Sequence, residues 1–472
     1  MRLQVMKFGG TSVGDADCIS RAAKIIISAT RESSVIAVVS AVSGVTNRLI
    51  AAAERAATGD ENASIEIKAT LTEQHTAALN VLIKDEAARS QLATELKQII
   101  EEVEARCRGT ALLRELTPRT LAMISSAGER LSARLLAAAL QESGIQAVAI
   151  DATELIVTEA DFAQADPLMT ETRERATARL LPLIRDGLVP VVTGFIGATL
   201  EGVLTTLGRG GSDYSATILG SALSADEIII WTDVDGVLTA DPRLVPTARL
   251  LQEISYSEAA ELAYFGAKVL HPKTLQPVAD AGIPVSIRNS FAPEKAGTKI
   301  TRTGHSSEAG VRAITAIKNV SLITVGGRGI VGVIGVAAKT FTAAASVRAN
   351  VLLISQSSSE NDICFIVEST EADRTVKALK KIFASDLVHH TVEHIRVTPE
   401  ICIIAAVGER MHGTPGIAGR LFSSLGKKGV NIIAIAQGSS EYNVSFVVEE
   451  SEMQSAMIAI HEEFELGRRS FK

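Results

Sequence analysis

The 472-residue sequence predicts an α/β fold, in which a mostly parallel sheet with helices on both faces is followed by two ferredoxin-like βαββαβ units. Two observations predict this fold. Short apolar runs alternate with helical segments in the first part of the chain, and the last third contains an internal repeat. A length of 472 residues with 46% hydrophobic and 21% charged residues provides enough apolar material for about two to four packed domains.

Composition excludes several classes of protein. The net charge of -7, with 47 basic and 54 acidic side chains, argues against a surface that neutralises nucleic-acid phosphates, and one Trp with four Tyr leaves little for base stacking. Unbroken apolar runs stay below the roughly 18 residues of a membrane helix, and the start lacks the features of a signal peptide. We therefore expect a cytoplasmic protein that binds neither nucleic acid nor membrane.

Cysteines and histidines give little support to a metal site or a disulfide framework. The four cysteines are widely spaced without a CxxC pair, which favours reduced, buried thiols. The nearest approach to a ligand cluster is the group His389, His390 and His394, which better fits a solvated linker. We therefore predict no metal ligands on the chain itself.

The first elements alternate as an α/β fold requires. The apolar run Leu3–Phe8 predicts a strand that stops at a glycine pair, and residues 19–30 have helical spacing. The β-branched run Ser34–Val39 is typical of a strand buried on both faces. Residues 62–116 predict helix, with 91–107 as the clearest amphipathic part.

Strands are predicted again at Ala147–Ile150, 189–192 and 228–231, each before a turn that contains Gly or Asp. Active sites of such sheets lie at the carboxyl ends of the strands, where the motifs below are found. Residues 289–310 are rich in Pro, Gly, Ser, Thr and charge, so we expect a catalytic domain at 1–305.

The internal repeat follows this boundary. Two segments superpose without a gap at an offset of 81 residues, which aligns Phe341 with Phe422 and Phe365 with Phe446. Each copy has the order of elements of a βαββαβ unit. We expect the first unit at 311–395 and the second at 396–472.

The first motif that could carry chemistry is the strand end at Lys7, Gly9 and Gly10. Glycines let a backbone approach phosphate, and exposed amides at a helix start bind it, while Lys7 could reach the transferred group. The alternative is a tight turn beside a surface lysine.

A second motif, residues 205–216, places Arg209 among glycines before Asp213. The two-pronged guanidinium of Arg209 suits a carboxylate or phosphate, and Asp213 could hold a lysine in place. The alternative is a glycine turn in which Asp213 caps the helix.

A third motif places Glu129 and Arg130 in an Ala-rich helical segment. Such a carboxylate could hold a substrate ammonium, or it could form an internal ion pair. Further on, Asp233 follows a buried strand and Arg243 closes the segment, which suits the edge of a nucleotide site or a simple hairpin. Lys268 stands among apolar residues and either faces phosphate or extends along the surface.

One motif is interpreted as a decoy. The sequence from Gly327 to Gly332 matches the dinucleotide fingerprint G-x-G-x-x-G after a strand. Its repeat partner carries Arg410 where the second glycine should stand. We therefore interpret it as the βα turn of the repeat.

Taken together, the motifs resemble the signature blocks of aspartokinase over the whole chain. The matching blocks, in order, are KFGGTSV, SAVSGVTN, GERLSA, VTGFIGA, TTLGRGGSDYSA, WTDVDG, DPR and FGAKVLHP. The tandem repeats resemble paired ACT domains. The resemblance implies ATP- and Mg²⁺-dependent phosphorylation of the β-carboxylate of L-aspartate, the first step toward lysine, threonine and methionine.

The resemblance also assigns roles by position. Lys7 would stabilise the transferring phosphoryl group, and Asp213 would orient it. The aspartate site would comprise Ser40, Thr46, Glu129, Phe195 and Arg209. The nucleotide site would comprise Lys7, Gly9, Gly10, Thr232, Asp233, Arg243 and Lys268. Leu238 departs from the family, where a Tyr often stands near the base.

Paired ACT domains imply feedback by an amino acid, and the matched turns look more like threonine-sensitive than lysine-sensitive members. The expected effector-site residues are Asn350, Gln356, Asn431 and Gln437. The family often nests the first unit in the second, so residues 311–317 could give a strand to the second. We also expect a homodimer or homotetramer formed through these domains, and the alternative is that the repeat serves dimerisation alone.

Two other functions are weighed. A bifunctional aspartokinase–homoserine dehydrogenase would need a longer chain, because the sequence stops shortly after the second repeat. A non-enzymatic amino-acid sensor would not need Lys7, Glu129, Arg209 and Asp213 together. The sequence therefore favours a monofunctional kinase.

Overall fold

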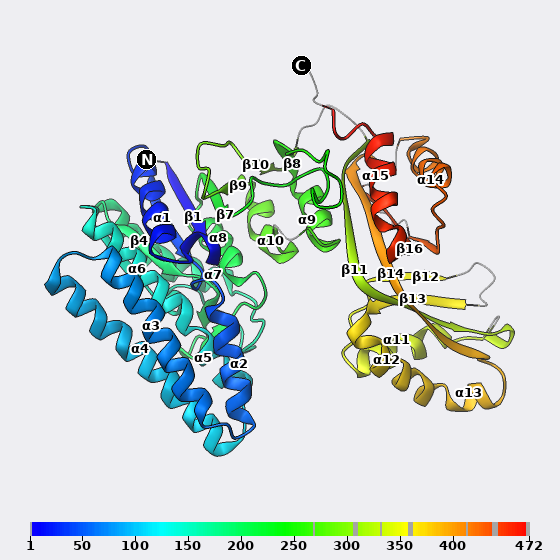
Figure 1. The fold of residues 1–472 in the computed structure, drawn as a ribbon, viewed down its shortest axis with the longest axis horizontal. Coiled ribbons are helices and arrows are strands. Elements are labelled where there is room, and N and C mark those ends of the chain that lie inside the picture. The colour runs from blue at the N-terminus through cyan, green and yellow to red at the C-terminus, as the bar shows by residue number, and fades with distance from the viewer. Residues whose placement is uncertain are drawn as a thin grey trace. The chain divides into compact units, whose positions relative to one another are not determined.

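The computed structural model describes residues 2–267, 270–304, 310–330, 333–356, 362–411, 414–436 and 442–468 (Figure 1). The chain forms two compact units. The first contains Met1–Val237, Leu250–Tyr256 and Val269–Gly304. The second contains Leu238–Arg249, Ser257–Lys268 and His305–Lys472, so it includes two segments from inside the predicted catalytic domain.

The first unit is built on an eight-stranded sheet with the order β3-β4-β2-β1-β7-β9-β10-β8. Every neighbouring pair is parallel except β9 and β10, which confirms the mostly parallel sheet predicted from the sequence. The strands are β1 Leu3–Phe8, β2 Ser34–Val39, β3 Ala147–Ile150, β4 Val189–Thr193, β7 Glu227–Thr232, β8 Glu253–Ser255, β9 Val285–Asn289 and β10 Thr298–Thr301. A separate hairpin joins β5 Ile196–Ala198 to β6 Leu204–Thr206.

Helices cover both faces of this sheet. Its helices are α1 Ala16–Ala29, α2 Val45–Ala57, α3 Asn62–Leu82, α4 Glu86–Leu113, α5 Pro118–Ser125, α6 Ala127–Glu142, α7 Met169–Arg185, α8 Gly211–Ala222 and α10 Pro272–Ala281. Met6 and Phe8 of β1 belong to the apolar core shared with α1 and α6, whereas Val5 lies beside Gly220 of α8. Because side chains alternate along a strand, Lys7 points to the α8 face as Val5 does.

The predicted helical region 62–116 is confirmed as two long helices, α3 and α4, which run side by side (Figure 1). Their buried residues include Leu71 and Val103 in the same apolar core as β1. The side chain of Asp85 caps α4 by accepting a hydrogen bond from the Ala88 amide at 2.7 Å. That cap replaces one of the partners that the first turn of a helix lacks.

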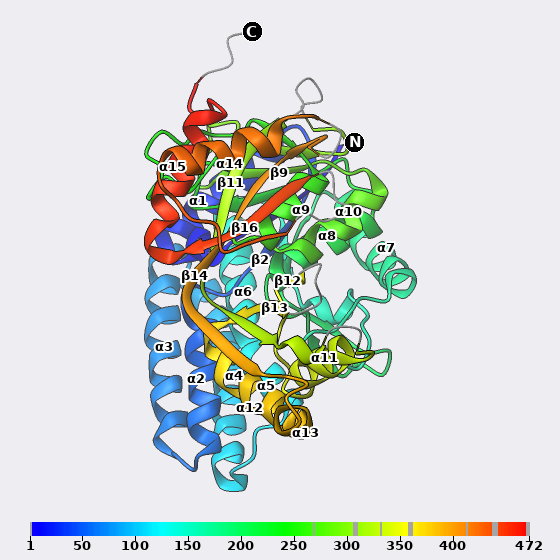
Figure 2. The ribbon, with the colours of Figure 1, turned by 90° about the vertical axis from the view of Figure 1, so that its right-hand side faces the viewer.

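The second unit contains one six-stranded antiparallel sheet with the order β12-β13-β11-β14-β16-β15. Two long strands, β11 and β14, form its centre (Figure 2). The strands are β11 Gly310–Gly326, β12 Leu353–Gln356, β13 Asp362–Glu368, β14 His394–Glu409, β15 Ala434–Ala436 and β16 Asn443–Glu449. The helices are α9 Tyr256–Tyr264, α11 Val336–Ser346, α12 Ser369–Ile382, α13 Ala384–Val388, α14 Ile417–Lys427 and α15 Met453–Glu463.

The repeat in the sequence is a repeat in the structure. Helix α14 and strand β16 begin and end 81 residues after α11 and β13. The aligned aromatic residues form matching edge-to-face pairs: the ring centroids of Phe341 and Phe365 lie 5.9 Å apart, and those of Phe422 and Phe446 lie 6.0 Å apart. The two copies therefore bury the same kind of core with the same residues.

The first half of β11 belongs to the sheet of the second copy. Its residues 310–317 pair with 403–409 of β14, and Val311 and Ile314 share an apolar core with Phe446 and Leu421. The second half of β11 pairs with β13 of the first copy. At Gly327 the chain enters a short 3-10 turn over Arg328–Ile330, while Gly332 lies outside the described residues.

Candidate active site

The end of β1 carries a buried cation. Lys7 is 8% exposed, and its Nζ lies 2.5 Å from Oδ1 of Asp213 in the first turn of α8. Both side chains are shielded from water, which strengthens their attraction. The structure thus brings together the two residues that the sequence analysis proposed for catalysis, and it excludes the surface lysine considered as the alternative.

Helix α8 presents its amino-terminal end at this point. The helix begins after Gly210, which has φ 72°, a left-handed conformation that glycine adopts without strain. A Cβ on Gly211 would lie 2.8 Å from Cδ2 of Phe195, so only glycine permits this close packing. Amides at the start of a helix favour a nearby anion, and the carboxylate of Asp213 provides a negative charge at the start of α8.

A second buried carboxylate belongs to Glu129 in the first turn of α6. Its side chain is 3% exposed, and Oε2 has no hydrogen-bond partner among the residues that the structure describes. Burial raises the pKa of Glu129 to about 8, against the lowering effects of the Ala41 amide, its own amide and the charge of Lys7. Such a group can accept a cation that enters the site.

The helix start that carries Glu129 packs tightly on the loop after β2. A Cβ on Gly128 would lie 2.5 Å from Cβ of Ala41, so glycine is required there. Arg130, the next residue, instead pairs with Glu102 at 3.0 Å and with Asp151 at 3.1 Å. Internal ion pairs, the alternative considered for this motif, are therefore formed by Arg130, whereas Glu129 makes no ion pair with a described residue.

Phe195 lies just beyond β4 in a left-handed conformation with φ 69°. For an aromatic residue this backbone costs roughly 1–3 kcal/mol and is held only by its surroundings. Its amide donates to Oγ of Ser215 at 3.0 Å, and its carbonyl accepts from the Leu207 amide at 2.8 Å. Ser215 is not among the residues predicted from the sequence, and its only signal there is its place two residues after Asp213.

The loops after β1 and β2 complete this edge of the sheet. The Gly9 amide donates to the Trp231 carbonyl at 3.0 Å, and a Cβ on Gly10 would lie 3.0 Å from the Ala41 carbonyl oxygen. Ser40 and Thr46, both partly buried, flank the turn into α2. This loop therefore lies against Gly10 on one side and Gly128 on the other.

Arg209 and Asp233 are exposed. Arg209 makes no ion pair with any described residue. Burial lowers the pKa of His271, and the charges of Lys273 and Arg209 lower it further. Thr232 ends β7, and its hydroxyl donates to Oδ1 of Asp233 at 3.2 Å. The guanidinium of Arg209 is thus available to a ligand.

In the turn beyond β7, where a hairpin is the alternative to a nucleotide site, Asp235 has partners within the protein. Asp235 accepts from Nδ2 of Asn289 at 2.7 Å and pairs with Lys295 at 2.6 Å, before Gly236 with φ 141°. Arg243 lies in the second unit, where it is 80% exposed and pairs with Asp241 at 2.6 Å. Leu238 belongs to the same segment, and Lys268 lies outside the described residues.

Comparison with known proteins follows the same division of the chain. The sequence profile of the amino acid kinase family matches residues 2–289, and that of the ACT domain matches residues 323–383 and 404–464. Aspartokinase 1 of Arabidopsis thaliana, a chloroplast protein, is 36% identical over 98% of this chain and 80% of its own. The chain belongs to the aspartokinases of the amino acid kinase family.

Aspartokinase structures have the same fold. Aspartokinase III of E. coli, solved with aspartate and ADP, matches with a TM-score of 0.81 and 31% identity over 98% of this chain and 99% of its own. Aspartate kinase of Clostridium acetobutylicum matches with a TM-score of 0.78 and 26% identity over 98% and 100% of the two chains. The resemblance predicted from the motifs is therefore confirmed for family and fold.

Longer relatives exist as well. A bifunctional aspartokinase/homoserine dehydrogenase of Arabidopsis thaliana is 36% identical over 98% of this chain. The chain spans about half the length of this and similar bifunctional relatives, with 51% covered here. The shared part comprises both the kinase region and the repeats.

The aspartokinase chain has exposed side chains at the positions expected for an effector. Asn350, Gln356 and Asn431 are exposed, while Gln437 lies outside the described residues. Among the described residues, no three His, Cys, Asp or Glu side chains are placed to hold a metal ion together. No described helix is long and apolar enough to cross a membrane.

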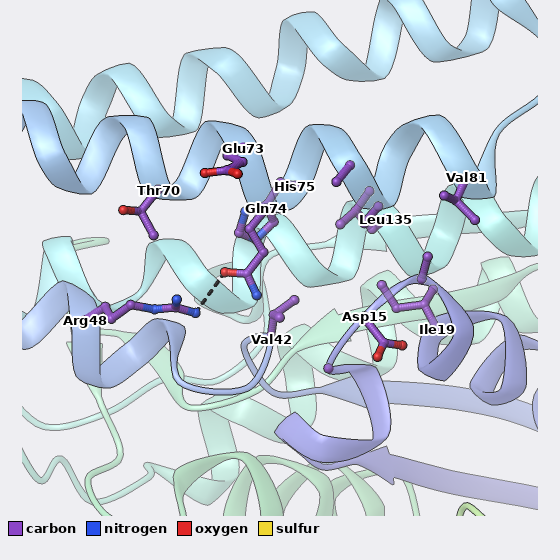
Figure 3. Close-up of a pocket in the computed structure, with 14 residues that line it drawn as sticks. Asp15, Ile19, Val42, Arg48, Thr70, Glu73, Gln74, His75, Val81 and Leu135 are labelled. Carbon is purple, nitrogen blue, oxygen red and sulfur yellow. Dashed lines mark hydrogen bonds between the residues drawn. The ribbon is translucent and has the colours of Figure 1, made fainter.

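A cavity of about 510 Å³ lies elsewhere in the first unit, between α1, α2, α3 and α6 (Figure 3). Arg48 reaches into it and donates to Oε1 of Gln74 at 2.8 Å. The lining residues include Asp15, Val42 and His75. Lys7, Glu129 and Asp213 do not line this cavity, so it is separate from the candidate active site.

Proposed function

We propose that the chain phosphorylates the β-carboxylate of L-aspartate with ATP to give 4-phospho-L-aspartate, the first step toward lysine, threonine and methionine. The observation that carries the proposal is the buried pair of Lys7 and Asp213 at the carboxyl end of β1. The buried carboxyl of Glu129, whose Oε2 has no hydrogen-bond partner among the described residues, supports it. So does the likeness to E. coli aspartokinase III, which was solved with aspartate and ADP.

The reaction needs charge stabilisation more than acid–base catalysis. A carboxylate with a pKa near 3.9 is already a nucleophile at neutral pH, so no base has to remove a proton. Phosphoryl transfer then depends on position and on cations that offset the charge of two approaching anions. Lys7 supplies one such cation, and the magnesium that accompanies ATP supplies another.

In this proposal the protein binds both the α-ammonium and the α-carboxylate of aspartate. Glu129 binds the α-ammonium, because its buried Oε2 has no hydrogen-bond partner among the described residues and gains from a nearby cation. Arg209 binds the α-carboxylate through its two-pronged guanidinium. Ser40, Thr46 and Phe195 line the remainder of the pocket.

The nucleotide is held by residues at the ends of β1 and β7 and by two cations beyond them. Gly9 and Gly10 offer backbone amides to the phosphates, as glycine-rich turns do. Thr232 and Asp233 follow β7, while Arg243 and Lys268 supply positive charge. A Leu at position 238 leaves adenine without the aromatic side chain that relatives often have nearby.

The paired repeats serve regulation. We propose that they bind an amino acid, with threonine as the first candidate and lysine as the second, and that they join chains into a homodimer or homotetramer. An E. coli aspartokinase III structure with lysine and aspartate supports the lysine alternative. A cytoplasmic location also stays a prediction.

The deciding experiment traps the acyl phosphate. The purified chain with ATP, Mg²⁺ and L-aspartate should form a hydroxamate when hydroxylamine is added, and L-glutamate should give none. Threonine binding without any hydroxamate would instead identify an amino-acid sensor. Absence of both would contradict the proposed function as a whole.

A further inference from the structure

A segment between two strands of the first unit packs into the second copy of the repeat. The segment Leu238–Arg249 lies between β7 and β8 in the sequence, but it belongs to the second unit, whereas both strands belong to the first. Its Ala240 and Val245 are 4% and 1% exposed, and they share an apolar core with Phe446 and Ile460. Arg243, which we propose binds the nucleotide, lies between these two anchors.

A buried histidine holds the same segment. His461 of α15 is 2% exposed, its Nε2 lies 3.0 Å from Oγ1 of Thr239, and its Nδ1 lies 3.3 Å from Oγ1 of Thr247. A neutral imidazole offers one donor and one acceptor, and a hydroxyl can serve either, so both ring nitrogens are satisfied. Burial and the charge of Arg249 lower the pKa of His461, against the effect of Glu462.

Two more hydrogen bonds join the segment to the second copy of the repeat, one at its middle and one at its end. Nε of Arg249 donates to the Leu466 carbonyl at 2.6 Å, and Nε2 of Gln454 donates to the Leu244 carbonyl at 3.1 Å. The segment is thus bound by apolar burial at its centre and by polar contacts along its length.

The first copy of the repeat provides an internal comparison. Leu379 and Ile460 are 81 residues apart and are both 0% exposed, so helices α12 and α15 present the same face to their sheets. The next residue differs: Lys380 is exposed, whereas His461 is buried. The fold of the repeat therefore does not require a buried side chain at this position.

A second difference between the copies has the same consequence. Asn443 stands where the first copy has Asp362, and its Nδ2 donates to Oε2 of Glu261 at 2.6 Å. Glu261 belongs to Ser257–Lys268, the other segment from inside the predicted catalytic domain. The second copy thus carries specific side chains for both segments.

We propose that His461 is a positioning residue for the nucleotide, which holds the segment of Arg243 in place so that ATP affinity depends on the second copy of the repeat. This inference rests on the proposed function and names how the nucleotide site is kept ordered. An ordered segment binds more tightly, because less conformational freedom is lost on binding.

The test is His461→Leu in the full chain, with steady-state kinetics for both substrates. We expect the KM for ATP to rise about fivefold or more, as a lost coupling between sites would give, with kcat and the KM for aspartate unchanged. His461→Gln keeps one donor and one acceptor and should restore part of the ATP affinity. Lys380→Leu, at the matching position of the first copy, should leave all three parameters unchanged.

Three outcomes would overturn the inference: an unchanged KM for ATP, an equal rise in the KM for both substrates, or the same effect from Lys380→Leu. Should His461→Leu fail to fold, the exposed Thr247→Val removes one hydrogen bond only, and it must also raise the KM for ATP. The variant Arg243→Ala distinguishes a failure of the proposed nucleotide site from a failure of the positioning role of His461. If Arg243→Ala raises the KM for ATP and His461→Leu does not, the proposed function survives and the positioning role is lost.

Discussion

Lys7 and Asp213 form an ion pair of 2.5 Å between the end of strand β1 and the first turn of helix α8. Their side chains are 10% and 14% exposed, so water screens the pair weakly. Asp213 therefore fixes the direction of the lysine ammonium. A cation held this way needs little rearrangement when a phosphoryl group arrives.

The first prediction concerns the loss of this cation. Lys7→Ala should lower kcat by about 10²–10³-fold or more, because one preorganised charge is removed from the transition state, while the KM for aspartate changes little. Steady-state hydroxamate formation measures both. Near-wild-type turnover in the purified variant would remove Lys7 from catalysis.

The variant Asp213→Asn is the matched control that tests whether Asp213 orients the ammonium of Lys7. It keeps Lys7 and the size of the side chain but removes the charge that orients the ammonium. We expect a loss of kcat smaller than that of Lys7→Ala. A loss larger than that of Lys7→Ala would give Asp213 a role beyond orientation.

The second prediction follows from the raised pKa of Glu129, about 8 in the chain without substrate. The α-ammonium of aspartate binds the ionised carboxylate, so kcat/KM for aspartate should rise with pH up to about 8. Glu129→Gln should lack this rise and should raise the KM for aspartate about tenfold or more. A pH profile identical to that of the wild type would separate Glu129 from substrate binding.

The third prediction concerns stability at the same residue. The folded pKa of about 8 lies above the ordinary 4.5, so the stabilisation from the bound proton is full below pH 4.5 and is lost as pH rises through 8. Glu129→Gln keeps an uncharged group there. Without ligands, its urea midpoint relative to the wild type should therefore increase from pH 5 to pH 8, and a constant difference would contradict the assignment.

The fourth prediction concerns Arg209, which is exposed and makes no ion pair with a described residue. Arg209→Ala should raise the KM for aspartate roughly 10- to 100-fold, since a charged hydrogen-bonded pair with the α-carboxylate is lost. Arg209→Lys keeps the charge but not the fork and should recover only part. An unchanged KM for aspartate would contradict this role.

Much of the fold could be predicted because its signals are local. The β-branched run of β2 and the gap-free repeat need no knowledge of distant contacts. Alternation along β1 places Lys7 on the face opposite Phe8, which is also readable from sequence. Which helix then meets Lys7 depends on the order of strands, and no local pattern encodes that order.

Other features had no signal in the sequence. Phe195 adopts φ 69° although left-handed backbone usually accompanies Gly or Asn, and its contacts with Ser215 and Gly211 come from residues distant in the sequence. The segment Leu238–Arg249 directly follows a strand of the first unit, yet it packs with the second. Its buried apolar residues are too few to indicate which core they join.

The last prediction concerns the effector. An amino acid can regulate the enzyme only if it binds two states of the chain with different affinities, and the paired repeats are where we expect it to bind. Threonine should lower hydroxamate formation in a saturable way, and Asn350→Ala or Asn431→Ala should raise the concentration needed, because each removes an exposed amide from one copy. Lysine is titrated in parallel. Inhibition by lysine alone would replace threonine as the effector, and no inhibition by either, singly or together, would leave the repeats with assembly as their role.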